Sequence, residues 1–347
     1  MTGNTPYAAG LLVGLTILLP WTTMWRLGTD DPTVAVQNTP LWLITVGAVA
    51  ALALWTAGTD AWLGGWLGYL SLRALPSDGS AAFEVLALAA VGVAVVVASR
   101  TIPESWHLWI IAALVTVGLL ETGYVVLQAM GYDPLWVGNH FPARLRMLGT
   151  LGNENFVGAY LGILLVLGPR WAWPLFAFGI VLTNALTGLI AASVGLLVRA
   201  RVHWMGWAVL AGAFTGWMAW HGALSLQIRG RVWAAAVADT TPWTALFGHG
   251  LGSWADRMPK VQPWVGVGEH FVQAHNDYLQ FWYEAGLLGV ALLIGWLWTH
   301  RAMFTHLRYG GALAALSVTA LTMFPFHLAV LGTLGALLLG LATKGDA

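Results

Sequence analysis

The sequence predicts an all-α, polytopic integral membrane protein, and its composition, its apolar segments and its placement of basic residues lead to that class. Of the 347 residues, 58% are hydrophobic and only 9% are charged, whereas an ordinary soluble domain carries roughly 25% charged residues. The mean hydropathy is +0.72. Because the net charge is zero, nothing indicates a nucleic-acid partner. The absence of cysteine excludes disulfides and thiolate chemistry.

Apolar runs bounded by polar residues, glycine or proline predict about twelve helical segments. These are residues 7–26, 41–57, 60–75, 83–99, 105–127, 154–168, 172–184, 187–198, 204–223, 279–299, 311–323 and 326–342. Several, such as 187–198, are too short to span ~30 Å of hydrocarbon at ~1.5 Å per residue. We expect these to be tilted, extended at their ends, or half-helices buried against neighbours. The first run lacks a preceding basic residue and a cleavage site, so we interpret it as a retained helix.

The chain is predicted to form one membrane domain, residues 1–347, with one large external loop, residues 225–278. Under strict alternation of the segments, one side collects basic residues in short connections: Arg100, Arg170, Arg199, Arg201, Arg301, Arg308 and Lys344. The positive-inside rule makes that side cytoplasmic, although Arg26 and Arg73 argue mildly against it. The same alternation gathers polar stretches on the outer face: Gly149–Asn155, Asn184, the external loop and Phe324–His327. Polar residues concentrated on one face beside lipid suggest a site for an amphipathic substrate.

Four motifs in the C-terminal part of the chain carry a resemblance to a known family. They are "GTLGNENFVGA" from Gly149, "RGRVWAAAVADTTPWTALFGHGLGS" from Arg229, "HNDYLQFWYEAGLLG" from His275, and "FPFHLAVLGTLGALLLGL" from Phe324. In this order, over roughly 200 residues, they resemble the O-antigen ligase and O-antigen polymerase-like superfamily. The third matches that family's pattern of His, then Asn, Ser or Gln, then nine residues, then Gly-x-x-Gly, without a gap.

This resemblance implies a membrane-embedded glycosyltransferase that needs neither a metal ion nor another cofactor. Such an enzyme would move a glycan from a polyprenyl diphosphate carrier to an acceptor hydroxyl, with inversion at the sugar carbon. The acceptor would be a glycolipid, a glycan or a protein, so ligase, glycan polymerase and protein O-oligosaccharyltransferase all stay open. The expected location is the bacterial inner membrane, with the site facing the periplasm or the cell exterior.

The chemistry of this transfer indicates which residue types to look for. A polyprenyl diphosphate is a good leaving group, so the enzyme needs a base for the acceptor hydroxyl and cations for the diphosphate. Neutral imidazole, with an unperturbed pKa of ~6.5, suits the first task, and guanidinium, which binds phosphate oxygens bidentately, suits the second. We therefore assign His275 as the base or acceptor-orienting residue. Arg229, four residues before Trp233 as the family pattern requires, is the first diphosphate ligand and Arg231 the second.

Each assignment has a plainer interpretation. His275 could be an interfacial histidine at a helix start, and the two arginines a solvated pair near anionic headgroups. Asn276 is a candidate substrate contact, yet Asn276 and Asp277 also suit a helix start, where their side chains accept backbone N–H bonds; Asp277 is a weaker candidate for orienting the imidazole.

The remaining polar and glycine residues are either further substrate-binding candidates or have structural roles. Arg144 and Arg146 precede the GTLGN element and are further substrate-binding candidates, although ordinary surface arginines explain them as well. Asn153 and Asn155 are interpreted as caps of the next helix. The three glycines Gly248, Gly250 and Gly252 are interpreted as a turn, since no strand precedes them to make a phosphate-binding fingerprint.

One departure from the family pattern concerns the second arginine that many relatives carry at the outer end of a middle helix. Leu186 stands at the comparable position. Either Arg144 or Arg146 substitutes from another segment, or the diphosphate is held differently.

Three other functions stay open. A metal-dependent lipid-linked glycosyltransferase would use an acidic pair in the first external loop, where Asp30 and Asp31 lie. A transporter or lipid flippase would bury ionisable groups at mid-membrane, for which Glu121 is the candidate. A zinc site is the third, but its histidines lack helical ligand spacing: His249, His270 and His275.

Overall fold

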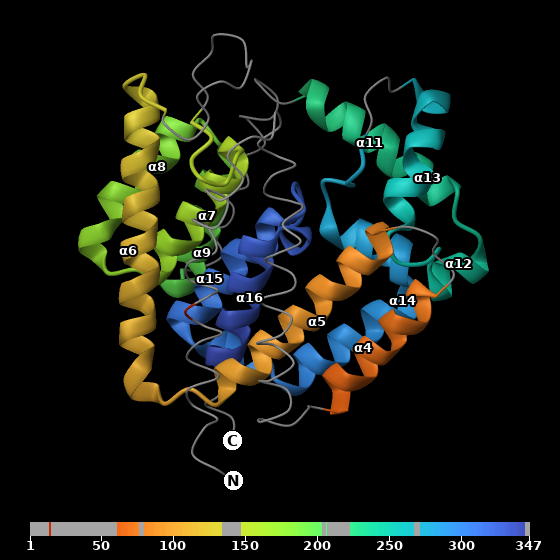
Figure 1. Ribbon diagram of the computed structural model, residues 1–347, viewed down its shortest axis with the longest axis horizontal. Helices are drawn as coiled ribbons and strands as arrows, with labels where there is room; N and C mark the ends of the chain where they lie inside the picture. The colour runs from red at the N-terminus through yellow and green to blue at the C-terminus, as the bar shows by residue number, and fades with distance from the viewer. Residues whose placement is uncertain are drawn as a thin grey trace.

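In the computed structural model every regular element of the described residues is a helix, which confirms the all-α class (Figure 1). The structure describes residues 61–75, 80–133, 147–202, 223–266 and 271–343, with Gly14 and Gly206 as isolated positions. The helices expected at 7–26, 41–57 and 204–223 therefore lie almost entirely outside the described residues.

Each apolar segment expected within the described ranges forms a helix. These are α4 (Ala61–Ala74), α5 (Ser80–Arg100), α6 (Glu104–Ala129), α7 (Glu154–Leu167), α8 (Trp173–Thr183), α9 (Leu186–Arg199), α14 (Asp277–Thr299), α15 (Leu307–Thr319) and α16 (Ala329–Ala342). Short 3₁₀ turns join some of them: η2 (Arg170–Ala172), η5 (Arg301–Thr305) and η6 (Pro325–His327).

Local signals explain where α6 begins and ends. Pro103 precedes it and Glu104 lies in its first turn, where a negative charge favours the helix dipole. At the other end Gly131 has a φ of 86°, and two backbone bonds close the turn, Gly131 N to Gln128 O at 2.9 Å and Tyr132 N to Leu127 O at 2.9 Å. This is the paired C-terminal bonding that a left-handed glycine allows.

Helix length limits how many of these elements could cross a membrane alone. Within the described residues α6 and α14 are long and apolar enough by length and composition. The helices α7, α9 and α16 have 14 residues each, which is about 21 Å at ~1.5 Å per residue and less than the ~30 Å of hydrocarbon. The expectation of about twelve complete membrane spans is therefore not confirmed. The expectation that several segments are too short to span the hydrocarbon is confirmed.

Contacts between helix ends show that the helices alternate in direction. At one end, which we call the basic end, Arg100 Nε donates to Thr343 Oγ1 at 3.1 Å and its Nη2 lies 3.2 Å from His300 Nε2. The ends of α5, α14 and α16 therefore meet there. Arg199, at the end of α9, donates to the carbonyl oxygens of Val166 and Gly168 at the end of α7.

The opposite end of the bundle, which we call the motif end, holds the family-like elements. Asp277 N, at the start of α14, donates to Ala320 O just after α15 at 2.9 Å. Phe156, in the first turn of α7, packs its ring on Phe324 before α16, with centroids 5.5 Å apart. The alternating direction of the segments predicted that Gly149–Asn155, the start of α14 and Phe324–His327 lie at the same end. The structure brings these three stretches together there.

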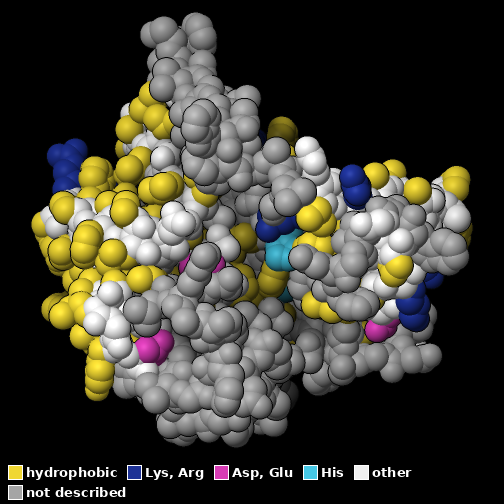
Figure 2. Space-filling model, turned by 90° about the horizontal axis from the view of Figure 1, so that it is seen from above, with side chains coloured by type: hydrophobic (Ala, Val, Ile, Leu, Met, Phe, Trp, Pro, Cys, Tyr) yellow, Lys and Arg dark blue, Asp and Glu magenta, His cyan; other side chains and the backbone are white. Residues whose placement is uncertain are grey.

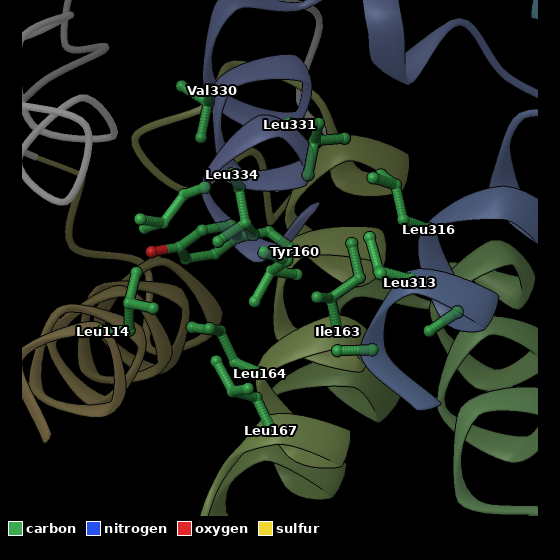
Figure 3. Close-up of a cluster of buried hydrophobic side chains, with 14 of the residues drawn as sticks. Leu114, Tyr160, Ile163, Leu164, Leu167, Leu313, Leu316, Val330, Leu331 and Leu334 are labelled. Carbon is green, nitrogen blue, oxygen red and sulfur yellow. The ribbon is translucent and has the colours of Figure 1, made fainter. Parts of the chain in front are cut away.

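The core lies where α7 meets α6, α15 and α16 (Figure 3). The side chains there are buried and almost all aliphatic: Leu114, Tyr160, Ile163, Leu164, Leu167, Leu313, Leu316, Val330, Leu331 and Leu334. Small residues let the helices approach more closely elsewhere. A Cβ on Gly188 of α9 would collide with the backbone of Gly158 of α7, and one on Gly195 would lie 2.8 Å from Gly311 O of α15. Such contacts are typical of helices that associate inside a membrane.

The segment expected to be an external loop, residues 225–278, is largely helical. It contains α11 (Ala223–Ala238), α12 (Pro242–Phe247), α13 (Ser253–Val261) and η4 (Gln262–Val265), which gather beside the first half of α14 (Figure 1). Short local signals specify these helices: Thr241 and Thr244 form a reciprocal capping box at the start of α12, each satisfying a backbone N–H of the other.

Candidate functional site

A break inside α14 explains two of the glycine-containing motifs. Gly286 has φ 70° and ψ 178° in the middle of the helix, so the carbonyls before it lose their helical partners. The segment after α12 replaces them: His249 N donates to Tyr283 O at 2.9 Å and Gly250 N to Glu284 O at 3.0 Å. A Cβ on Gly286 would collide with Gly248 N. The Gly-x-x-Gly of α14 and the Gly-x-Gly-x-Gly loop are thus two halves of one close backbone contact.

The backbone N–H groups of the glycine loop, residues 248–254, are occupied by the protein. Besides the two bonds to α14, Leu251 N donates to Arg73 O at 3.1 Å. The buried carboxylate of Glu284 accepts from Gly252 N at 3.0 Å and from Trp254 N at 3.3 Å. The interpretation of this loop as a turn, and not as a phosphate nest, is therefore confirmed. Arg73, whose Nη2 donates to Gly248 O at 2.7 Å, lies at this turn.

His275 lies directly before α14 in a left-handed backbone conformation, with φ 52°. Non-glycine residues hold such a conformation only where their neighbours fix it. Ala274 N donates to Gln280 Oε1 at 2.9 Å and Ala274 O accepts from Trp233 Nε1 at 2.7 Å. On the other side Asn276 caps α14, its Oδ1 accepting from Leu279 N at 3.0 Å. The helix-start interpretation of Asn276 is confirmed, and its contact with a substrate stays a prediction.

The imidazole of His275 is half-buried between two aromatic rings. Its centroid lies 5.6 Å from that of Phe271 and 5.1 Å from that of Phe324, both edge-to-face. No hydrogen bond to the ring is formed within the described residues. Burial, and then the positive charge of Arg229, lower the pKa of His275 to about 4. The ring is therefore neutral near pH 7 and can accept a proton.

Arg229 extends from α11 to the segment between α15 and α16, residues Ala320–Leu328, which we call the α15–α16 turn. Its Nη1 donates to Thr322 O at 2.9 Å, whereas its Nε is buried and has no hydrogen-bond partner in the described part of the chain. Burial lowers the pKa of Arg229, yet a guanidinium remains charged in such surroundings. A buried cationic N–H without an acceptor is costly, and a bound anion would remove that cost.

The other predicted anion ligands are not gathered at this point. Arg231 is exposed, because residues two apart on a helix lie about 200° apart around its axis. Its Nη1 lies near Gly266. Arg144 and Arg146 lie outside the described residues. Leu186 begins α9 and provides no cation, so the described residues supply one guanidinium beside His275.

The GTLGN element is held by the end of α6. Glu121 is fully buried and its carboxylate accepts from Thr150 N at 2.8 Å and Thr150 Oγ1 at 2.7 Å. Gln128 Oε1 accepts from Gly149 N at 2.8 Å. Asn153 caps α7, as predicted, because its side chain accepts from Asn155 N at 2.8 Å. Asn155, which was also predicted to be a cap, contributes its backbone N–H to this bond and not its side chain. The Glu121 carboxylate, the candidate for a transport function, thus has a structural role.

A second histidine at this end was missed by the sequence interpretation. His327 Nδ1 donates to Asp277 Oδ1 at 2.6 Å, and its Nε2 lies 3.2 Å from Gln280 Nε2. Burial lowers the pKa of His327, but the charge and the hydrogen bond of Asp277, together with the charge of Glu284, outweigh this effect, so the net shift of the pKa is upward. Asp277 therefore orients His327 and not His275. The partners are fifty positions apart, so no local spacing revealed the pair.

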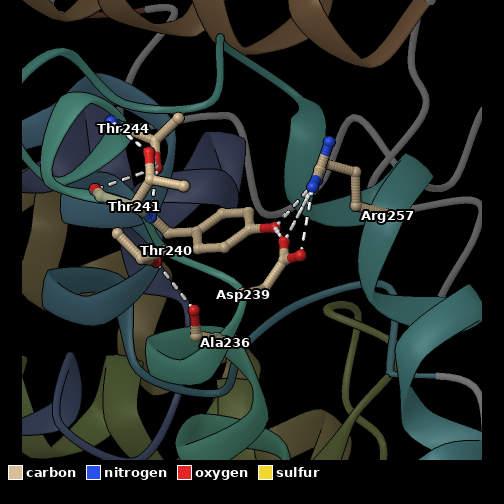
Figure 4. Close-up of polar contacts among 7 residues, drawn as sticks. Ala236, Asp239, Thr240, Thr241, Thr244 and Arg257 are labelled. Atoms are coloured by element: carbon tan, nitrogen blue, oxygen red, sulfur yellow. Dashed lines mark hydrogen bonds and ion pairs between the residues drawn. The ribbon is translucent and has the colours of Figure 1, made fainter.

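A third polar cluster connects the helices of the 225–278 segment to α14 (Figure 4). Arg257 of α13 forms hydrogen bonds of 2.9–3.2 Å with the Asp239 carboxylate, and Tyr283 Oη donates to Asp239 Oδ2 at 2.6 Å. The guanidinium side chain is 47% exposed, so the ion pair contributes little stability by itself.

Seen from above, a histidine side chain lies in a hollow in the middle of the surface, beside a basic side chain (Figure 2). Within the described residues no group of three His, Cys, Asp or Glu side chains could hold a metal ion; His270, Asp30 and Asp31 lie outside those residues. In comparisons with known proteins, no family model and no curated protein sequence matches this chain. The family resemblance therefore stays a prediction.

Proposed function

We propose that this chain is an integral membrane glycosyltransferase of the O-antigen ligase type. It would transfer a glycan from a polyprenyl diphosphate carrier to an acceptor hydroxyl, at the outer face of a bacterial inner membrane. The observation that carries the proposal is the meeting of His275 and Arg229 at the α15–α16 turn. One contacts Phe324 and the other Thr322, although the two residues come from different motifs far apart in the sequence.

The charge states of the two groups suit the two halves of the reaction. The acceptor oxygen attacks the anomeric carbon, its proton passes to the neutral His275 ring, and the carbon–oxygen bond to the diphosphate breaks with its electron pair. Arg229, whose buried Nε has no hydrogen-bond partner in the part of the chain that the structure describes, stabilises the negative charge on the departing diphosphate. Attack opposite the leaving group inverts the configuration at the sugar carbon. No metal ion and no cofactor is needed for these steps.

The surface of the helices supports a location in lipid. Large apolar side chains are exposed along α6 and α8, among them Trp109 at 77% and Val181 at 62%. Hydrophobic side chains cover much of that side in the view from above (Figure 2). Soluble monomers rarely expose contiguous apolar surface of this extent. The positive-inside rule would place the basic end in the cytoplasm, which supports an outward orientation of the motif end.

The alternative functions have less support. A glycan polymerase or a protein O-oligosaccharyltransferase would use the same base and the same arginine, and differs in the acceptor. A transporter would need an ionisable group available to its cargo, but Glu121, its candidate, is bonded to Thr150.

The test is reconstitution of the purified chain in proteoliposomes with a polyprenyl diphosphate glycan. Glycolipid, glycan and hydroxyl-containing peptide acceptors are supplied separately, each with and without a strong chelator. We expect transfer to one acceptor class, unchanged by the chelator and lost in His275→Ala. No transfer to any acceptor, or full transfer by His275→Ala, would overturn the proposal; loss of transfer with the chelator would overturn its metal independence.

A further inference from the structure

The first two turns of α14 carry three buried polar side chains on one face. Asp277, Gln280 and Glu284 follow one another at intervals of three and four residues, so they lie in line along the helix. Each has about 2% of its surface exposed. Each accepts a backbone N–H from a different segment: Phe326 at 2.7 Å, Ala274 at 2.9 Å and Gly252 at 3.0 Å, respectively. This polar stripe therefore fastens the α15–α16 turn, the residue before His275 and the glycine loop to one helix.

His327 joins the α15–α16 turn to this stripe by its side chain. Its ring lies between Asp277 Oδ1, at 2.6 Å, and Gln280 Nε2, at 3.2 Å, and its side chain is 12% exposed. Because Gln280 Oε1 accepts from Ala274 N, the amide nitrogen of Gln280 is the group that faces His327. The turn is thus fixed twice to Asp277, through Phe326 N and through the ring of His327.

The same turn contacts both groups of the proposed site. Thr322 O holds Nη1 of Arg229, and the Phe324 ring packs against His275 at 5.1 Å between centroids. Within the described residues no hydrogen bond orients the His275 ring, so its orientation depends on the rings of Phe271 and Phe324. A displacement of the turn would therefore move the proposed base and the proposed cation together.

We infer that His327, held by Asp277, is a positioning residue for the proposed transfer, acting through Phe324 on His275 and through Thr322 on Arg229. The inference depends on the proposed function for its meaning in catalysis. The structural part of the inference, that His327 controls the surroundings of His275, can be tested without any substrate.

The variants are His327→Ala, which removes the bond to Asp277, and His327→Asn, whose amide nitrogen can replace the ring Nδ1 as donor. His306→Ala is the matched control, because His306 is an exposed histidine beyond η5, near the basic end. A displacement of reacting groups by about 1 Å costs roughly a hundredfold in rate. We therefore expect kcat to fall roughly tenfold to a hundredfold in His327→Ala, to recover in His327→Asn, and to stay unchanged in His306→Ala.

The second readout needs no substrate. Hydrogen exchange at the imidazole C2 of His275, followed over pH by mass spectrometry of the peptide, gives the pKa of that residue alone. Because the aromatic rings keep water from His275, we expect its pKa to rise from about 4 toward the ordinary 6.5 in His327→Ala, and to return in His327→Asn. If His327→Ala does not fold, Phe324→Leu replaces it, since this variant leaves the Asp277–His327 bond in place and should shift His275 in the same direction.

These outcomes separate the inference from the proposed function. Absence of transfer by the wild-type protein defeats the proposed function, and the exchange measurement still decides whether His327 controls His275. An unchanged His275 pKa in folded His327→Ala, or in Phe324→Leu where that variant is used, overturns the inference even if kcat falls. An asparagine variant as impaired as the alanine variant overturns it too, because the bond to Asp277 would then not be the cause.

Discussion

His275 and His327 lie on two sides of the same turn and are held in opposite ways. His327 is fixed by a carboxylate at 2.6 Å and faces an amide, and Asp277 raises its pKa against the effect of burial. His275 is held by ring edges and by its backbone, and burial and Arg229 lower its pKa to about 4. The His327 ring forms its hydrogen bonds within the protein, whereas the nitrogens of the His275 ring have no hydrogen-bond partner among the described residues.

Other buried polar groups at the motif end also differ in whether their hydrogen-bonding atoms have partners. Glu121 and Glu284 are bonded to backbone N–H groups of the loops that they hold. Arg229 has a buried Nε without a hydrogen-bond partner among the described residues. Polar groups whose hydrogen bonds are complete contribute stability, whereas a buried group without a partner is a candidate for contact with a ligand. We expect substitutions of the first kind to change unfolding and those of the second to change transfer.

Removal of the His275 imidazole should have the largest effect on transfer. His275→Gln keeps a polar side chain of similar size but provides no base, so we expect kcat to fall roughly 10²- to 10⁴-fold. The rate of glycan transfer in proteoliposomes is the measurement. Thermal unfolding, followed by the fluorescence of the 22 tryptophans, should stay close to wild type because the ring makes no hydrogen bond within the described residues. A stable variant with full activity would show that His275 is not the base.

The two arginines of α11 offer the next comparison, because they differ in exposure and not in chemistry. In Arg229→Ala, loss of the cation should reduce kcat roughly 10²- to 10³-fold, and Arg229→Lys should recover only part of it, since a lysine cannot bind bidentately. Arg231→Ala removes an exposed guanidinium two residues away and should change the rate less than about twofold. Equal losses in Arg229→Ala and Arg231→Ala would contradict the assignment of the buried arginine.

The helices within the apolar segments, and the position of the motifs at one end of the bundle, could be predicted from the sequence. Apolar runs predicted α6, α7 and α9 because a helix with apolar residues on most of its surface leaves a clear compositional signal. The alternation of these runs placed Gly149 and Phe324 at the same end. The exposure of Arg231 also follows from its spacing of two residues from Arg229, but only once α11 is known to be a helix.

Features that depend on distant partners could not be predicted. The break at Gly286 lies inside a continuous apolar run, and it is stable because His249 and Gly250 occupy the carbonyls it releases. The pairing of His327 with Asp277 likewise depends on two helix ends meeting. The helices inside the segment 225–278 were not predicted, because α11 and α13 are polar enough to resemble a loop.

The pH dependence of transfer should distinguish a buried base from a solvated one. In the proposed mechanism the neutral form of His275 is the active form, and burial and Arg229 lower the pKa of this residue to about 4. The active form therefore persists as the pH falls from 7 to 5, and we expect the acid limb of kcat/KM near pH 4 and not near 6.5. Removing the positive charge in Arg229→Ala should move the limb of the residual activity upward. A limb near 6.5 in the wild type would contradict the burial of the base.

The smallest effect is expected where a buried bond is removed far from the proposed chemistry. Thr150→Val preserves the shape of the side chain but leaves the Glu121 carboxylate without the hydroxyl donor at 2.7 Å, which should lower the free energy of unfolding by about 1–3 kcal/mol. The control is Thr116→Val on the same α6 helix, where the exposed hydroxyl donates only to Ala112 O of its own helix. Because that carbonyl keeps its helical bond, the control should unfold like the wild type. Thermal unfolding by tryptophan fluorescence compares the two, and equal stability would show that Glu121 does not need Thr150, so that its carboxylate would again be available for a function of its own.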